Sequence, residues 1–256
     1  MKILLCHLTL SMGPLEENLK ILERAVQVAG EMKADWVITP ETAVPGYHFY
    51  KMNPEQKLDE QPAAYLQPLL DLVKLNKQYL FLGAGEYDVK DKCNYNTCFV
   101  FGPEGELIGK HRKNHSHGFG GEGWVTNCTV AEPVQVGSVK TGIMVCSDAW
   151  YIECPKRLAE QGAQLLVDIA GWPVSEECGD PLPSWIKCSN ETGLPMVLCN
   201  QTGKTEWLDF TVGQSVYIED GQSKLTYSGN DALLVFEWNE QNHKAVSPDF
   251  EVIRFT

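Results

Sequence analysis

Short apolar runs alternate along the chain with stretches in which apolar residues recur every three or four positions. Residues 2–9 form an apolar run of strand length, and residues 15–29 place apolar side chains on one helical face. Residues 34–39 then form a second apolar run. A strand, a helix and a strand within about forty residues make a βαβ unit, which implies parallel strands. The pattern therefore predicts an α/β fold.

The same alternation continues towards the C-terminus. Further helices are predicted at about 63–77, 154–161 and 184–193. Further strands are predicted at 79–84, 96–101, 106–110, 164–170 and 195–200, with shorter β segments up to about residue 238. The turn Gly-Pro-Glu-Gly between the second and third of these strands indicates a hairpin. Because no repeat or linker interrupts the pattern, we predict one domain over residues 1–256.

One apolar run, residues 141–145, ends at Cys146 and is followed at once by Ser147, Asp148 and Trp150. Sites on α/β sheets are commonly built at strand ends, where a side chain is held rigidly yet faces a pocket. A cysteine in this place is more often a small buried hydrophobe. A nucleophilic role therefore requires a base and a cation elsewhere in the chain.

Two residues of the required types also follow predicted strands. Glu41 comes directly after the strand that stops at Pro40, and Lys113 closes the basic cluster after the hairpin. A glutamate accepts a thiol proton, and a lysine ammonium favours both the thiolate and a developing oxyanion. Together with Cys146 they favour nucleophilic attack on a carbonyl or nitrile carbon. Taken alone, Glu41 is also compatible with a capping role and Lys113 with a solvated surface charge.

Composition narrows the classes of partner. There are 34 acidic and 21 basic residues, giving a net charge of −13, which disfavours nucleic acid and anionic membranes. No apolar run approaches the ~20 residues of a membrane span, and the N-terminus is typical of a strand rather than a signal peptide. The nine cysteines are odd in number and irregularly spaced, so we predict a reduced, cytoplasmic location. The histidines at 111, 115 and 117 lack the spacing of a helix-borne metal pair, and we predict no metal.

These motifs together resemble those of the carbon–nitrogen hydrolase (nitrilase) superfamily. The matching segments are Pro40-Glu41, His111-Arg112-Lys113 and residues 142–146, in the family's order and with its spacing. The segment Glu122-Gly123-Trp124, in a glycine-rich loop over 118–124, resembles the family's second glutamate. The resemblance extends from the first strand to about residue 235. It implies a four-layer αββα sandwich and a homodimer or higher homo-oligomer formed through a helical face.

The resemblance also implies roles for individual residues. Glu41 would be the general base, Cys146 the nucleophile that forms a thioester, and Lys113 with the Ser147 N–H the oxyanion stabilisers. Glu122 would position the substrate or the incoming water. No metal or organic cofactor is implied, because both half-reactions are acyl transfers.

The substrate is only partly constrained. Cys146-Ser147-Asp148 is closer to the family's amidases than to its nitrile hydrolases, which favours a linear amide or an N-carbamoyl compound as a small-molecule substrate. Transfer of the acyl group to an amine is the main alternative, nitrile hydrolysis a lesser one, and a non-catalytic binding protein a third. We expect an aromatic pocket with Asp148 and Trp150 bearing on substrate choice, and with walls from Tyr47, His48, Phe49, Trp124, Trp150 and Trp172.

Two departures from the family pattern stand out. Asp168 occupies a position where the family usually has asparagine, so it is either an added charge near the pocket or a paired buried acid. The arginine of a later helix motif is missing in Cys188-Ser189-Asn190-Glu191-Thr192. Any anion-binding or packing role of that arginine is therefore in doubt for this chain.

Overall fold

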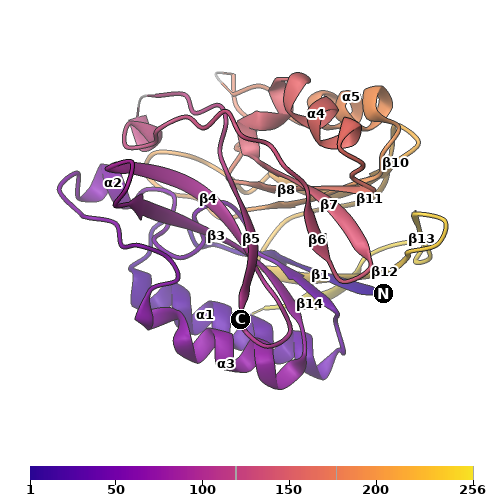
Figure 1. The fold of residues 1–256 in the computed structure, drawn as a ribbon, viewed down its shortest axis with the longest axis horizontal. Helices are drawn as coiled ribbons and strands as arrows, with labels where there is room; N and C mark the ends of the chain where they lie inside the picture. Colours follow the sequence, from indigo (N-terminus) through magenta and orange to yellow (C-terminus); the bar gives the residue numbers. More distant parts are fainter. Residues whose placement is uncertain (119, 177, 256) are drawn as a thin grey trace.

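The computed structural model describes residues 1–118, 120–176 and 178–255. Within these residues the strands form an eight-stranded sheet and a six-stranded sheet. Figure 1 shows the two sheets stacked in the middle of the molecule, with α1 (Leu15–Glu31) and α3 (Gln67–Asn76) below them. Helices α4 (Glu153–Glu160) and α5 (Leu182–Thr192) lie above them. The predicted four-layer αββα sandwich is confirmed.

The larger sheet is built mainly from the N-terminal half of the chain. Its strand order is β13-β12-β1-β2-β3-β4-β5, and β14 also pairs with β12. The strands β1 and β2 are parallel, as are β2 and β3, whereas β4 is antiparallel to both of its neighbours, β3 and β5. The bounds are β1 (Lys2–His7), β2 (Trp36–Ile38), β3 (Tyr79–Asp88), β4 (Cys93–Phe101), β5 (Leu107–Arg112), β12 (Ala232–Asn239), β13 (Lys244–Ala245) and β14 (Glu251–Arg254).

The smaller sheet carries the cysteine strand at an inner position. Its order is β11-β10-β9-β8-β7-β6, with β7, β8 and β9 parallel. The bounds are β6 (Val134–Val136), β7 (Val139–Val145), β8 (Leu165–Ala170), β9 (Met196–Asn200), β10 (Gln214–Glu219) and β11 (Gln222–Ser228). Four short helical segments lie in the connections: α2 (Phe49–Met52), η1 (Ala64–Leu66), η2 (Gly120–Glu122) and η3 (Cys146–Trp150).

Both faces of the larger sheet are buried, because successive side chains of a strand point to opposite faces. On β1, Ile3 and Leu5 belong to the core shared with the smaller sheet, whereas Leu4 and Cys6 pack in the core beneath α1 and α3. This explains why these strands appear in the sequence as continuous apolar runs instead of alternating ones. The parallel strands end at one edge of the sandwich, where the loops after β2 and β7 meet.

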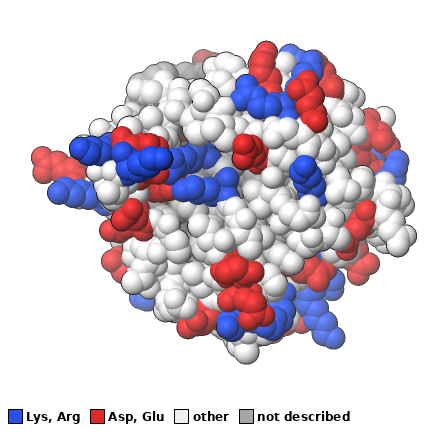
Figure 2. Space-filling view, in the orientation of Figure 1, with Lys and Arg blue, Asp and Glu red and all other residues white. Residues whose placement is uncertain are grey.

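The surface carries charges of both signs. Figure 2 shows acidic and basic side chains interspersed on one face, with uncharged areas between them. At the β3–β4 end of the sheet, Arg112 pairs with Glu86 and Asp88, and Glu86 also pairs with Lys110. In the described part of the chain, no helix has the length and apolar character needed to cross a membrane.

Candidate active site

The candidate site is centred on a buried ion pair between the two sheets. Glu41 lies three residues after β2, Lys113 follows β5 directly, and both side chains are fully buried. The Lys113 Nζ lies 2.8 Å from Glu41 Oε1, which also accepts a hydrogen bond of 2.7 Å from Asn96 Nδ2. Glu41 Oε2 accepts a 2.8 Å bond from the Gly171 N–H. These donors fix the carboxylate in one orientation.

Glu122 completes this cluster from the loop after β5. It ends the short helix η2, is almost fully buried and forms an ion pair with Lys113 Nζ. Its other oxygen accepts a 2.8 Å hydrogen bond from the backbone N–H of His117. One lysine therefore bridges two carboxylates, one from each side of the site. Within the predicted glycine-rich loop over 118–124, Phe119 lies outside the described residues.

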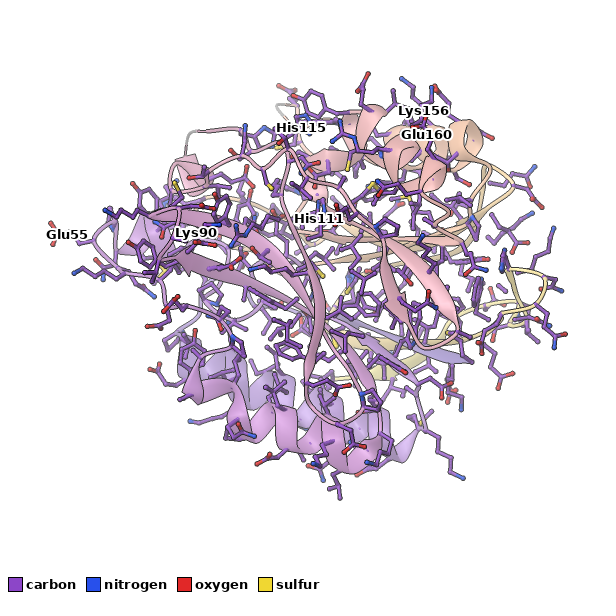
Figure 3. All side chains as sticks on the ribbon, in the orientation of Figure 1. Glu55, Lys90, His111, His115, Lys156 and Glu160 are labelled. Atoms are coloured by element: carbon purple, nitrogen blue, oxygen red, sulfur yellow. The ribbon has the colours of Figure 1, made fainter. Side chains whose placement is uncertain are left out.

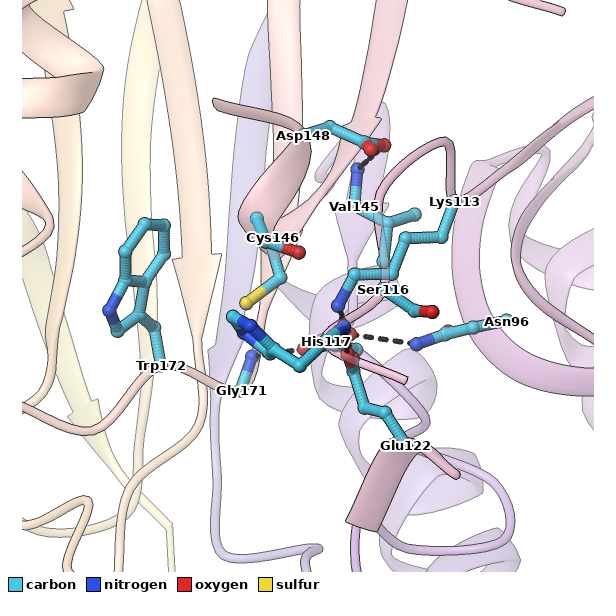
Figure 4. A network of polar contacts seen from close by, with 12 residues as sticks. Asn96, Lys113, Ser116, His117, Glu122, Val145, Cys146, Asp148, Gly171 and Trp172 are labelled. Atoms are coloured by element: carbon cyan, nitrogen blue, oxygen red, sulfur yellow. Dashed lines mark hydrogen bonds and ion pairs between the residues drawn. The ribbon is translucent and has the colours of Figure 1, made fainter. Parts of the chain in front are cut away.

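Cys146 stands at the corner where β7 gives way to η3. Its backbone has φ of +53°, a left-handed conformation that residues other than glycine rarely adopt. Such a conformation is held only where the surroundings enforce it, and it is common at functional sites. In Figure 4 the Cys146 side chain lies between Trp172 on one side and the Lys113 cluster on the other. The structure thus brings the three predicted residues and Glu122 together.

The ionisation of the cluster follows from its burial. Burial raises the pKa of Cys146 well above its ordinary value, and the Glu41 charge adds to this, while Lys113 acts in the opposite direction. Burial also raises the pKa of Glu41, against the lowering effect of Lys113 and of a hydrogen bond from the Cys146 thiol. The pKa of Lys113 is raised because its two carboxylates outweigh its burial. The resting site therefore holds a neutral thiol facing a base, beside a permanent cation.

The turn after Cys146 is positioned to supply a backbone donor. Ser147 lies in the first turn of η3, where N–H groups lack partners within the helix. Its hydroxyl donates to the His115 carbonyl, which ties the turn to the loop after Lys113. An N–H in this position and a lysine ammonium are the donor types that stabilise an oxyanion.

A cavity of about 450 Å³ opens next to the cluster. Tyr47, Glu122 and Trp150 line it, as predicted for a pocket with aromatic walls. Trp172 is buried just behind, with its ring centroid 4.6 Å from that of Trp150 in an edge-to-face contact. The other lining residues are His48, Lys51, His117, Gly121, Cys178, Trp207 and Leu208.

Three predicted pocket residues, Phe49, Trp124 and Asp148, make structural contacts and do not line this cavity. Trp124 packs edge-on against Phe49 at 4.9 Å and donates to the Gly121 carbonyl, so it supports the loop that carries Glu122. Asp148 is fully buried, and its oxygens accept hydrogen bonds from Val145 N, Asn114 N, His115 N and His111 Nε2. Burial opposes the ionisation of Asp148, yet the His111 and His115 side chains and the charge of Lys113 hold its pKa well below its usual range. Asp148 thus fixes the turn that presents Cys146.

The only grouping of metal-ligand types within the described residues involves the same aspartate. His111, Asp148 and Cys154 bring one ligand atom each within 4.8 Å of one another. Because four donors already occupy the Asp148 oxygens, the hydrogen bonds account for this cluster without an ion. Figure 3 labels His111 and His115, whose rings approach the same carboxylate: His111 Nε2 lies 2.9 Å from Asp148 Oδ2, and His115 Nδ1 lies 3.6 Å from Asp148 Oδ1.

Several residues that shape the site were not singled out in the sequence. Asn96 and the Gly171 N–H bond to the Glu41 carboxylate, and Gln201 Nε2 donates to the Glu41 backbone carbonyl over 2.7 Å. The Asn200 side chain holds the backbone of Trp172: its Oδ1 accepts from the Trp172 N–H, and its Nδ2 donates to the Trp172 carbonyl. The sequence did contain a signal for Asn96, Asn200 and Gln201. Each is a polar residue within an apolar strand or directly after one, which indicates a side chain with a specific hydrogen-bonding role.

Sequence comparison identifies the family. Residues 8–225 match the model of the carbon-nitrogen hydrolase family. A glutamine-dependent NAD(+) synthetase of Rhodobacter capsulatus is 28% identical over 230 residues, covering 87% of this chain and 39% of that protein. The omega-amidase NIT2 of Mus musculus is 33% identical over 114 residues, covering 41% of each. The chain thus spans about two fifths of the length of these relatives.

Solved structures share the fold at low sequence identity. Nit3 of Saccharomyces cerevisiae, a nitrilase-superfamily member, has a TM-score of 0.83 and 18% identity, covering 94% of this chain and 90% of its own. An amidase from Nesterenkonia sp. AN1 has a TM-score of 0.83 and 20% identity, covering 95% and 92%. With the family model covering most of the chain, the resemblance seen in the sequence is confirmed: this protein belongs to the carbon–nitrogen hydrolase family.

Proposed function

We propose that this protein is a cysteine-dependent amidase that cleaves linear amides or N-carbamoyl compounds through a thioester. The observation that carries the proposal is the buried Glu41–Lys113–Glu122 cluster facing a thiol held in a left-handed turn beside a 450 Å³ cavity. A buried cation with two carboxylates is costly to maintain for stability alone. Its location beside a nucleophile and a cavity supports a catalytic role.

Acylation follows from the geometry. Glu41 accepts the proton of the Cys146 thiol as sulfur attacks the carbonyl carbon, and a C–S bond forms. The oxyanion is stabilised by Lys113 Nζ and the Ser147 N–H. When the intermediate collapses, the C–N bond breaks and Glu41 returns its proton to the departing nitrogen. The products are ammonia or an amine and a thioester on Cys146.

Deacylation repeats these steps with water in place of the thiol. Glu41 takes a proton from water, hydroxide attacks the thioester carbon, and the C–S bond breaks. The proton returns to the Cys146 sulfur, so the acid is released and the enzyme is regenerated. Glu122, paired to Lys113 at the cavity wall, is placed to orient the amide nitrogen or the water.

The relatives support an amidase. A mutant of the Nesterenkonia amidase has been solved with the acetamide moiety of fluoroacetamide covalently added at the active-site cysteine. Omega-amidase is the name of the mouse relative. Transfer of the acyl group, or of nitrogen, to an acceptor is the second candidate, and it is supported by the NAD(+) synthetase relatives that align over 87% of this chain.

Ammonia release from a panel of linear amides, N-carbamoyl compounds and nitriles tests the proposal. Turnover of at least one amide is expected, with loss of activity in Cys146→Ala. Cys178→Ala is the matched control, since this thiol lines the same cavity without contacting the cluster, and it should remain active. A panel of ordinary amines added as acceptors separates the two candidates, because thioester breakdown depends on the amine in a transferase, whereas in a hydrolase the acid forms at the same rate without it. Unchanged turnover in Cys146→Ala would exclude both.

A further inference from the structure

Two aspartates are buried on either side of the nucleophile, and their surroundings differ. Asp148 accepts four hydrogen bonds, including one from His111, as expected for an ionised carboxylate. Asp168, on β8, is fully buried as well, yet within the described residues its carboxyl group makes a single hydrogen bond, the 2.7 Å bond that Oδ1 accepts from the Cys146 N–H. Among the described residues, Asp168 Oδ2 has no hydrogen-bond partner, and no basic side chain pairs with this carboxyl.

An ionised carboxylate in such a place would be exceptionally unfavourable. A buried charge persists only where several donors or a counter-ion replace its hydration. A neutral acid with one acceptor in use and one hydroxyl unpaired is far less costly. Burial and the negative charge of Asp148 both favour the protonated form, and they raise the pKa of Asp168 well above its usual range.

The groups that face Asp168 add little positive charge. Lys113 is the one cation among them, and it is already bridged by Glu41 and Glu122. The titratable groups that face Asp168 from the neighbouring elements are Cys98, Cys146, Asp148, Cys154, Cys188, Glu41 and Lys113. The four thiols in this set are all buried enough to have raised pKa values, so they surround Asp168 with neutral groups.

The bond from Asp168 acts on the nucleophile itself. The N–H of Cys146 belongs to the residue with φ of +53°, and the preceding N–H, of Val145, is held by Asp148. The two aspartates therefore fix both peptide N–H groups at the corner between β7 and η3. Held as a neutral acid, Asp168 contributes an acceptor at this point without adding a negative charge beside a thiol that must become a thiolate.

We propose that Asp168 is a positioning residue: as a neutral carboxylic acid, it holds the Cys146 backbone in its left-handed conformation. The expected effect on turnover rests on the proposed function, whereas the protonation state of Asp168 and the reactivity of Cys146 can be measured without it. A neutral carboxylic acid here also resolves the two alternatives that the sequence left open for Asp168, since the residue is neither a pocket charge nor a salt-bridged acid.

Two variants distinguish the role of the Asp168 oxygen as a hydrogen-bond acceptor from any role of a negative charge on this side chain. Asp168→Asn keeps an oxygen for the Cys146 N–H and is permanently neutral, so it should keep kcat within about threefold of the wild type. Asp168→Leu keeps the branched shape, in a larger side chain, but has no acceptor, so kcat should fall about 100-fold, with KM within about threefold, because a small misplacement of a reacting group has this order of effect. Asp148→Asn is the contrasting control, because its ionised carboxylate should not tolerate the same change.

Infrared difference spectroscopy of wild type against Asp168→Asn at pH 7 tests the protonation state directly. The wild type should show a protonated carboxyl band that the variant lacks, and a carboxylate band in its place would overturn the proposal. Alkylation of Cys146 by iodoacetamide, followed by peptide mapping, provides a readout that needs no amide substrate. Alkylation in Asp168→Leu as fast as in the wild type would also overturn it. Absence of amide turnover in the wild type, by contrast, would count against the proposed function only.

Discussion

Replacing Lys113 with methionine tests how the site is held together. Methionine occupies a similar volume, so the main loss is the charge that Glu41 and Glu122 share. Removing one partner of a buried ion pair typically costs about 3–5 kcal/mol, because the remaining charge stays buried without compensation. For a chain of 256 residues, each kcal/mol lowers Tm by about 2–4 °C. The expected decrease in Tm at pH 8 is therefore roughly 6–20 °C.

The pH dependence distinguishes this explanation from simple loss of packing. Without Lys113, both carboxyl groups have folded-state pKa values raised above those of the unfolded chain, because burial acts on them without the cation. Their contribution to stability is then fully present below the unfolded pKa of about 4.3 and is lost as pH rises through the folded values. The Tm deficit of Lys113→Met should therefore shrink steadily from pH 8 to pH 5.

Thermal unfolding followed by circular dichroism over this pH range is the assay. Lys20→Met is the matched control, since Lys20 pairs with Glu17 at 2.8 Å on the exposed side of α1, and its Tm should match the wild type. A deficit in Lys113→Met that is the same at every pH would refute the electrostatic argument. So would a deficit no larger than that of Lys20→Met.

Three further outcomes follow from the geometry of the site. Activity should fall on the acid side as Glu41 becomes protonated, with a midpoint above its ordinary pKa of 4.5, and a pH–rate profile with a midpoint at or below that value would contradict its role as base. Glu41→Gln should keep the fold and lose turnover, measured by ammonia release and Tm, whereas retained turnover would remove the base from the mechanism. Gly83→Ala should lower both Tm and activity, because a Cβ there would lie 2.2 Å from the Pro40 carbonyl oxygen and 2.9 Å from Thr42 N, the neighbours of Glu41. Gly121→Ala, with its nearest contact at 3.4 Å, should be tolerated, and equal effects of the two alanine variants would contradict this steric account.

Much of the fold could be predicted because the apolar pattern is long and regular. Helices α1, α4 and α5 and strands β1, β8 and β9 were predicted to within a few residues. The pairing of β12 with β1 was not, because β12 lies about 230 residues further along the chain, and local periodicity carries no information on such long-range partners. The predicted helix over 63–77 begins as a 3-10 turn, and Pro68 then occupies the first turn of α3, where its missing N–H is no disadvantage.

The reacting residues of the site could be predicted from the sequence, whereas most of the residues that hold them in place could not. Glu41, Lys113 and Cys146 each follow a strand, but these strands belong to two different sheets, so their convergence was an implication of the family resemblance and not of the local pattern. The structural roles of Trp124 and Asp148 could not be predicted from the sequence, because tertiary contacts decide whether a side chain in a loop points into the cavity or away from it. Asn96 and Gln201 were missed for the same reason, since Asn96 donates to Glu41 from β4 of the larger sheet and Gln201 donates to it from the loop after β9 of the smaller sheet.

Mass spectrometry of the intact protein tests the central claim most directly. Glu122→Gln, which keeps the nucleophile, base and cation, is mixed with a linear amide and quenched in acid while deacylation is slow. The account predicts a mass gain equal to the acyl group, mapped to Cys146 and absent when Cys146→Ala is added. A protein that gains no mass with any amide it turns over, or a gain mapped to Cys178 or another of the nine cysteines, would contradict it.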